Sequence, residues 1–248
     1  MLLNADVGES FGVWSMGDDR ALMPVIDMAN IACGGHASDP VTMRKTVQLA
    51  LDHGVTLGAH PSYPDLLGFG RRPLPLTDNE IEAHVLAQVG ALDAIARAEG
   101  GHLTYVKPHG ALYNTMMIED RVFLAVMRAV SALDADLALM VLATPRIAHH
   151  QSLAAEFGLT LLKEAFADRR YTEDGVLDDR AHLGAVYHEW DAIRHQVLQL
   201  QTKHIVTARN GQDIPIEADV ICVHGDNPES IRTAAAIKSL LTPEPTQA

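Results

Sequence analysis

Four histidines and one aspartate stand where an apolar run of the sequence gives way to glycine and polar residues. They are Asp6, His36, His60, His109 and His224. Imidazole and carboxylate groups can move protons near neutral pH or bind a metal ion. If the apolar runs are parallel strands, the five side chains reach one edge of one sheet. Active sites of α/β enzymes lie at that edge.

A second group of reactive side chains follows other apolar runs. Lys107 ends such a run, where burial would either lower its pKa or suit the ammonium to stabilising an anion. His109, two residues later, is a candidate general base. Glu164 comes before the pair Arg169 and Arg170 at the end of a further run. This mixture suits a polar substrate or, equally, a salt-bridged loop.

The long loop 58–72 is rich in glycine and proline and ends in Arg71 and Arg72. Long irregular loops inside compact domains commonly bind ligands. The two guanidinium groups could hold a carboxylate or phosphate, or they could be ordinary surface arginines. At the end of the first apolar run, Asp6 and Glu9 could be a base, a metal ligand or a helix cap.

A metal site is one alternative for the histidines. Asp6, His36 and His60, together with His109, carry suitable donors, and three protein ligands with an open position would suit a hydrolytic zinc ion. The spacing has no compact signature such as His-Glu-x-x-His. The two glycine-rich nucleotide fingerprints, G-x-x-x-x-G-K-[ST] and G-x-G-x-x-G, are also missing, so we expect no nucleotide bound by those loops.

Composition narrows the class of protein. The formal charge of -13 disfavours nucleic acid as a partner. The longest apolar run, 137–143, is too short to cross a membrane. The N-terminus shows no secretory signal, and Cys33 and Cys222 are too few for a disulfide framework. We therefore expect a cytoplasmic protein with reduced thiols, Cys33 being a small packing residue.

The apolar runs predict buried strands separated by helices. They lie near 2–7, 27–33, 55–59, 103–107, 137–143, 159–164 and 219–223. Strand, polar loop, capped helix and next strand recur along the chain, which predicts an α/β fold with a (β/α) barrel of about seven parallel strands. An open doubly wound sheet stays as the alternative. Asn210-Gly211 predicts an inserted β-hairpin within 203–218. We expect one domain over 1–241 and a disordered tail over 242–248.

Local signals predict where helices begin. Asp39-Pro40, Thr144-Pro145 and Asn227-Pro228 each offer a capping side chain followed by proline, and Thr77 with Glu80 forms a capping-box pattern. Apolar residues from Leu183 to Leu200 repeat at helical spacing. Six further histidines are expected on exposed helix faces, namely 149, 150, 182, 188, 195 and 204.

Together these segments resemble the LamB/YcsF family. The resemblance rests on the following segments, which span nearly the whole chain: Leu3-Asn-Ala-Asp-Val-Gly-Glu9, Asn30-Ile-Ala-Cys-Gly-Gly-His36, Gly58-Ala-His-Pro-Ser-Tyr-Pro-Asp65, Gly68-Phe-Gly-Arg-Arg72, Val106-Lys-Pro-His-Gly-Ala-Leu-Tyr-Asn114, Glu164-Ala-Phe-Ala-Asp-Arg169 and Val223-His-Gly-Asp-Asn-Pro228. The chain departs from the family pattern at Leu2, where an acidic residue is usual, and at Ser38, where glycine is usual.

The resemblance implies a closed or nearly closed α/β barrel related to the polysaccharide-deacetylase-like fold. It also implies ATP-dependent opening of the lactam of 5-oxo-L-proline to L-glutamate, together with partner subunits B and C. An unstrained lactam is a poor electrophile, so ATP bound by the partners would phosphorylate its oxygen and leave this chain to add water.

Within that interpretation the site residues take roles. Asp6 or His109 would deprotonate water, Lys107 would stabilise the developing negative charge, and Glu164 would belong to the same catalytic group. Substrate would be bound by Asn30, His60, Arg71, Arg169 and Arg170. Two alternatives stay open: a metal-dependent deacetylase or amidohydrolase that needs no ATP, and a non-catalytic subunit that only binds substrate.

Overall fold

The computed structural model describes residues 1–223 and 228–242. Three sequence predictions therefore fall outside the described residues: the position of His224, the cap at Asn227 and all of the expected tail beyond Thr242.

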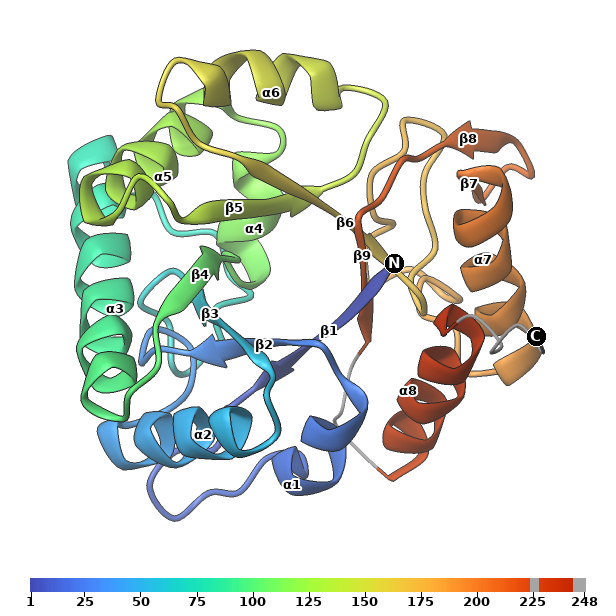
Figure 1. Cartoon of the computed structure of the whole chain (residues 1–248). Helices are drawn as coiled ribbons and strands as arrows, with labels where there is room; N and C mark the ends of the chain where they lie inside the picture. The colour runs from blue at the N-terminus through green and yellow to red at the C-terminus, as the bar shows by residue number, and fades with distance from the viewer. Residues whose placement is uncertain (224–227, 243–248) are drawn as a thin grey trace, which may run out of the picture.

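Within the described residues, seven parallel strands close into a barrel in the order β1-β2-β3-β4-β5-β6-β9, with β9 pairing back to β1 (Figure 1). The strands are β1 (Leu2–Val7), β2 (Met28–Ala32), β3 (Thr56–His60), β4 (Leu103–Val106), β5 (Ala138–Leu142), β6 (Leu161–Phe166) and β9 (Val220–Val223). The prediction of a (β/α) barrel is confirmed, and the open sheet is excluded because no edge strand remains between β9 and β1.

Helices surround the barrel and bury their apolar faces against it (Figure 1). They are α1 (Asp19–Leu22), the 3-10 turn η1 (Met23–Val25), α2 (Pro40–Asp52), α3 (Asp78–Ala98), α4 (Gly110–Met116), α5 (Asp120–Leu133), α6 (Ile147–Ala155), α7 (Trp190–Lys203) and α8 (Pro228–Leu241). In the described part of the chain, none of these helices has the length and apolar character needed to cross a membrane.

Capping side chains set the start of two helices as predicted. The Asp39 carboxylate accepts hydrogen bonds from the backbone N–H groups of Val41 and Thr42 at the start of α2. Thr77 and Glu80 form a capping box at the start of α3. Because each cap satisfies N–H groups that lack a partner within the helix, the chain turns from loop to helix at these residues.

Three local predictions were wrong. Helix α6 begins at Ile147 and not directly after Thr144. The Thr144 hydroxyl accepts from the N–H of Arg146 and its carbonyl from the N–H of Ile147, so these bonds form a turn before the helix. The helix predicted from the apolar residues Leu183 to Leu200 begins only at Trp190. Gly184, with a φ of 78°, interrupts the helical pattern, and Leu183 is exposed. His150 is buried against Phe123. The other five histidines of that group are exposed, but His182 and His188 lie in the loop before α7 and not on a helix.

The inserted hairpin is confirmed. Strands β7 (Ile205–Thr207) and β8 (Asp213–Pro215) pair antiparallel, and Gly211 between them has a φ of 87°.

The unusual residue at position 38 also has a backbone explanation. Ser38 has a φ of 74°, a region that favours glycine, so the serine adopts the conformation for which glycine is the ordinary choice.

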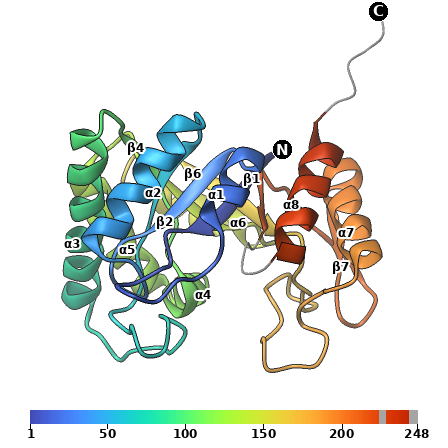
Figure 2. The same ribbon diagram turned by 90° about the horizontal axis from the view of Figure 1, so that it is seen from below.

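The segments that follow β1, β3 and β6 leave the barrel on the same side (Figure 2). Residues at the carboxyl ends of the strands therefore face this side. Deeper in the barrel, Met28, Tyr105, Met140 and Val220 form an apolar cluster separate from the main core. These residues come from four different strands, so their contact fills the barrel interior beneath the polar residues.

Gly58 makes room for the largest ring of that interior. It pairs in register with Asn30 on one side and Tyr105 on the other. A Cβ atom at Gly58 would lie 2.1 Å from Cζ of Tyr105. The Tyr105 hydroxyl in turn donates to Oδ1 of Asn30 at 2.7 Å. The absent side chain thus lets an aromatic ring cross the barrel and hold a polar residue above it.

We expect Gly58→Ala to lower the free energy of unfolding by about 1–3 kcal/mol, because the fully buried Tyr105 ring must move. Urea unfolding followed by circular dichroism measures this change. Gly90→Ala in α3 is the control, since its Cβ meets only Leu133 at 3.8 Å and alanine favours a helix. Equal stability of the two variants would contradict the packing argument.

Candidate active site

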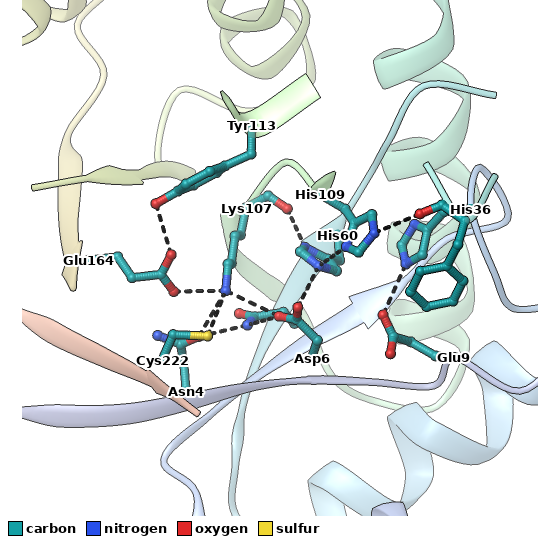
Figure 3. A network of polar contacts seen from close by, with 12 residues as sticks. Asn4, Asp6, Glu9, His36, His60, Lys107, His109, Tyr113, Glu164 and Cys222 are labelled. Atoms are coloured by element: carbon teal, nitrogen blue, oxygen red, sulfur yellow. Dashed lines mark hydrogen bonds and ion pairs between the residues drawn. The ribbon is translucent and has the colours of Figure 1, made fainter. Parts of the chain in front are cut away.

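Side chains from β1, β2, β3, β4, β6 and β9, or from the residue directly after the strand, meet at the carboxyl end of the barrel. Figure 3 shows most of them. The strands and the residues directly after them supply Asn4, Asp6, Asn30, His60, Lys107, Glu164 and Cys222. Asn4 and Asp6 lie two residues apart on β1, so both point to the same face of the strand. Asp6 was predicted from the sequence, whereas Asn4 was missed, although the two-residue spacing could have revealed it.

The ammonium of Lys107 is the centre of this group. Its Nζ lies 2.8 Å from Oε1 of Glu164, 3.1 Å from Oδ1 of Asp6 and 3.2 Å from Sγ of Cys222. Burial lowers the pKa of Lys107, but the neighbouring acidic groups, Asp6 first, outweigh it and raise that pKa well above its usual value. Of the two alternatives predicted for Lys107, this direction disfavours the lowered pKa and favours an ammonium that can stabilise an anion.

Asp6 connects the lysine to the histidines. Its Oδ1 accepts a hydrogen bond from Nδ2 of Asn30 at 2.8 Å, and its Oδ2 lies 3.2 Å from Nε2 of His60. Burial raises the pKa of Asp6, while His60 and Lys107 lower it by more, so this pKa lies well below its usual range. Asp6 is therefore an anion and a weak base.

Asn30 is held by a chain of hydrogen bonds across the barrel. Tyr105 donates to its Oδ1 at 2.7 Å, which directs the Nδ2 group to Oδ1 of Asn4 at 2.7 Å and to Asp6. Because Tyr105 fixes the orientation of the amide, Asn30 positions the Asp6 carboxylate. The sequence pattern gave no signal for the role of Tyr105, which looks like an ordinary strand residue.

Glu164 is fully buried on the far side of Lys107. Its Oε2 accepts a hydrogen bond from the hydroxyl of Tyr113 in α4 at 2.9 Å. Burial, first, and the nearby Glu164 charge raise the pKa of Tyr113 well above its usual value, so the phenol stays protonated and donates. Glu164 therefore neutralises part of the lysine charge inside the barrel.

Three histidines gather beside Asp6: His60 at the end of β3, and His36 and His109 from the loops after β2 and β4 (Figure 3). The rings of His36 and His109 are parallel with centroids 3.7 Å apart, and His60 stands at 83° to His109. Nε2 of His60 lies 3.0 Å from Nδ1 of His109. Gly70, at φ 63°, backs this stack, because a Cβ there would lie 2.9 Å from the Cβ of His36.

Glu9 closes the outer side of the stack, with Oε1 3.3 Å from Nε2 of His36. Burial and the neighbouring histidines lower the pKa of His36 well below its usual value and lower that of His109 to about 3. Both rings are therefore neutral at physiological pH. Glu9, His36, His60 and His109 offer ligand atoms within 4.8 Å of one another, so this group could hold a metal ion.

The structure separates the arginines that the sequence placed together. Arg71 lies over the Phe69 ring at 5.0 Å, and its charge contributes to the lowered pKa values of His36 and His109. Arg72 instead binds Asp65. Arg71, Arg169 and Arg170 were predicted to bind a carboxylate. Arg71 lies beside the histidines of the site.

The other two predicted arginines belong to the loop after β6. Arg169 is buried and donates from Nη2 to the carbonyl of Asp178 at 2.6 Å. Arg170 lies over the ring of Tyr187 at 5.7 Å, within the same loop. Their described contacts hold this loop together.

The thiols are not exposed to a substrate. Both Cys33 and Cys222 are buried and free. Burial raises the pKa of Cys33 to about 12, which agrees with a packing role. Cys222 is different because it touches Lys107, a contact that was not predicted from the sequence.

Comparison with known proteins agrees with this geometry. The LamB/YcsF family model matches residues 1–248. The 5-oxoprolinase A subunit of Vibrio cholerae is 52% identical over 239 residues, which is 96% of each chain. That of Chromohalobacter salexigens is 51% identical over 237 residues, covering 96% of this chain and 95% of its own.

A solved structure extends the likeness to three dimensions. The lactam utilization protein from Thermus thermophilus is 38% identical and superposes with a TM-score of 0.89, over 97% of this chain and 96% of its own. Matches of this extent in both sequence and structure include the strands and loops that build the site. The chain belongs to the LamB/YcsF family.

Proposed function

We propose that this chain is the A subunit of an ATP-dependent 5-oxoprolinase, a hydrolase that opens the lactam of 5-oxo-L-proline to give L-glutamate. The observation that carries the proposal is the buried cation Lys107, fixed at the carboxyl end of the barrel beside carboxylates and neutral imidazoles. Relatives about half identical over nearly the whole chain are named as the A subunit of 5-oxoprolinase, and that name supplies the substrate.

The weak bases of the site support a division of labour with partner subunits. Asp6 and His109 both have lowered pKa values, so neither is strong enough to drive water onto an unactivated lactam. Partner subunits B and C would use ATP to phosphorylate the lactam oxygen. A first water would then add to the activated carbon and the ring C–N bond would break, with the nitrogen taking a proton, to give an acyl phosphate. A second water would release the phosphate and leave the new carboxylate of glutamate. Activation of the carbon keeps the demand on the base small.

The charges of the site fit the remaining steps. Lys107 would stabilise negative charge that develops on oxygen when water adds, because its ammonium is held in place before the reaction. Arg71, at the exposed rim beside His36 and His109, would bind the substrate carboxylate. His60 and Glu164 would keep Asp6 and Lys107 in position.

The first test is reconstitution. We expect glutamate release and 5-oxoproline-dependent ATP hydrolysis when this chain is combined with subunits B and C from the same organism. Leaving out this chain should abolish glutamate release. Activity of this chain alone with ATP would contradict the division of labour.

The ion-pair group makes a prediction about stability. We expect Lys107→Met to lower the free energy of unfolding by about 3–5 kcal/mol, because Asp6 and Glu164 lose their buried cation. The double variant Lys107→Met with Glu164→Gln should lose less than the sum of the two single changes. Urea unfolding of all three variants measures this coupling, and strict additivity would show that the pair is not coupled.

Binding of the substrate carboxylate can be separated from chemistry. We expect Arg71→Gln to raise KM for 5-oxoproline by roughly 10–100-fold in the complex and to leave kcat nearly unchanged, since one charge-assisted hydrogen bond is lost. Arg97→Gln is the matched control, because Arg97 pairs with Asp93 on the outer helix α3. An unchanged KM for Arg71→Gln would remove this residue from the binding site.

A further inference from the structure

Backbone carbonyl groups fix the tautomers of two histidines. Nδ1 of His60 lies 2.6 Å from the carbonyl oxygen of Lys107, and Nε2 of His109 lies 3.0 Å from that of Phe69. A carbonyl oxygen only accepts hydrogen bonds, so these two ring nitrogens carry the protons. Whenever such a ring is neutral, its other nitrogen, Nε2 in His60 and Nδ1 in His109, carries a lone pair.

These two lone pairs face each other. Nε2 of His60 and Nδ1 of His109 are 3.0 Å apart, and Oδ2 of Asp6 lies 3.2 Å from the same His60 nitrogen. Lys107 contacts the other oxygen of Asp6, so its ammonium does not lie between these three atoms. Three acceptor atoms thus converge, and a positive charge between them would remove their mutual repulsion.

A second observation lies on the outer side of the same group. His36 is 2% exposed, and its Nδ1 is buried with no hydrogen-bond partner among the described residues. Such a polar atom is costly unless something outside the chain satisfies it. Its ring is stacked on His109, and its other nitrogen, Nε2, contacts Glu9, so the unsatisfied atom lies on a ring of the same cluster.

The formal charges of the surroundings favour a cation. Asp6, Glu9 and Glu164 carry three carboxylates, and Lys107 is the ammonium buried among them. The formal balance of these four residues is negative by two. Arg71 is exposed at the rim, where water screens its charge. A divalent ion would balance the buried carboxylates.

We infer that this site binds a divalent transition-metal ion of the zinc class. His60 and His109 supply nitrogen ligands through Nε2 and Nδ1, Asp6 supplies a carboxylate oxygen, and Glu9 with His36 borders the open side. The hydrogen bonds to the carbonyl oxygens of Lys107 and Phe69 are the outer contacts that orient metal-binding imidazoles in proteins. Such an ion would act as a Lewis acid beside Lys107.

This inference goes beyond the proposed hydrolysis, and its test needs neither ATP nor partner subunits. The protein is stripped with a chelator and titrated with Zn²⁺ by calorimetry and with Co²⁺ by visible absorption. We expect about one equivalent to bind with a d–d spectrum typical of nitrogen and oxygen ligands. His60→Ala and His109→Ala should each weaken binding by more than the roughly 10–100-fold that loss of an outer contact costs.

Surface histidines provide matched controls. His149 and His182 are exposed, and each lies beside an aspartate, Asp120 and Asp178, so both could bind metal adventitiously. His149→Ala and His182→Ala should leave the tight site intact. The inference would be overturned if His149→Ala or His182→Ala abolished tight binding. It would also be overturned if His60→Ala and His109→Ala left tight binding unchanged.

The wild-type protein gives a test that does not depend on the folding of variants. Ring-nitrogen NMR shifts of His60 and His109 should move when Zn²⁺ is added. An imidazolium of His60 with both nitrogens protonated, unchanged by Zn²⁺, would show that a proton fills the place of the metal and would overturn the inference. The proposed hydrolysis would survive that result, because glutamate release in the reconstituted complex is measured separately.

Discussion

The ion pair of Lys107 with Asp6 and Glu164 is the constraint on which the site depends. A buried ammonium is stable only when opposite charges and hydrogen-bond acceptors surround it, so the barrel must deliver both carboxylates to one point. Asp6 comes from β1 and Glu164 from β6, which are separated in the sheet by β9. Closure of the barrel through β9 is therefore what makes the ion pair possible.

The strand register then sets the height of each group. Asp6 pairs with Asn30, Asn30 with Gly58 and Gly58 with Tyr105, which places the Asn30 amide between the carboxylate and the phenol. Because a shift by one residue would turn every side chain to the other face, the apolar pattern of the strands also fixes the polar site. The strand register that buries the apolar side chains is therefore also the register that positions the polar side chains of the site.

The sequence predicted the barrel, the hairpin and the strand-end positions of Asp6, His60, Lys107 and His109, because apolar runs and turn residues are local signals. It did not predict contacts that depend on closure. The contact of Cys222 with Lys107 and the hydrogen bonds from tyrosines to Asn30 and Glu164 join segments that are distant in the chain. Nor does the sequence show that the described contacts of Arg169 and Arg170 lie within the loop after β6.

One peptide segment couples the two halves of the site. The side chain of Lys107 enters the ion-pair group, while its carbonyl oxygen accepts from Nδ1 of His60 in the histidine group. Pro108 follows directly, and its fixed φ limits how far His109 can move relative to Lys107. A displacement of the lysine would therefore reach both histidines through the backbone. Lys107 thus acts on both groups: its carbonyl oxygen fixes the tautomer of His60, and its ammonium stabilises the charge of Asp6.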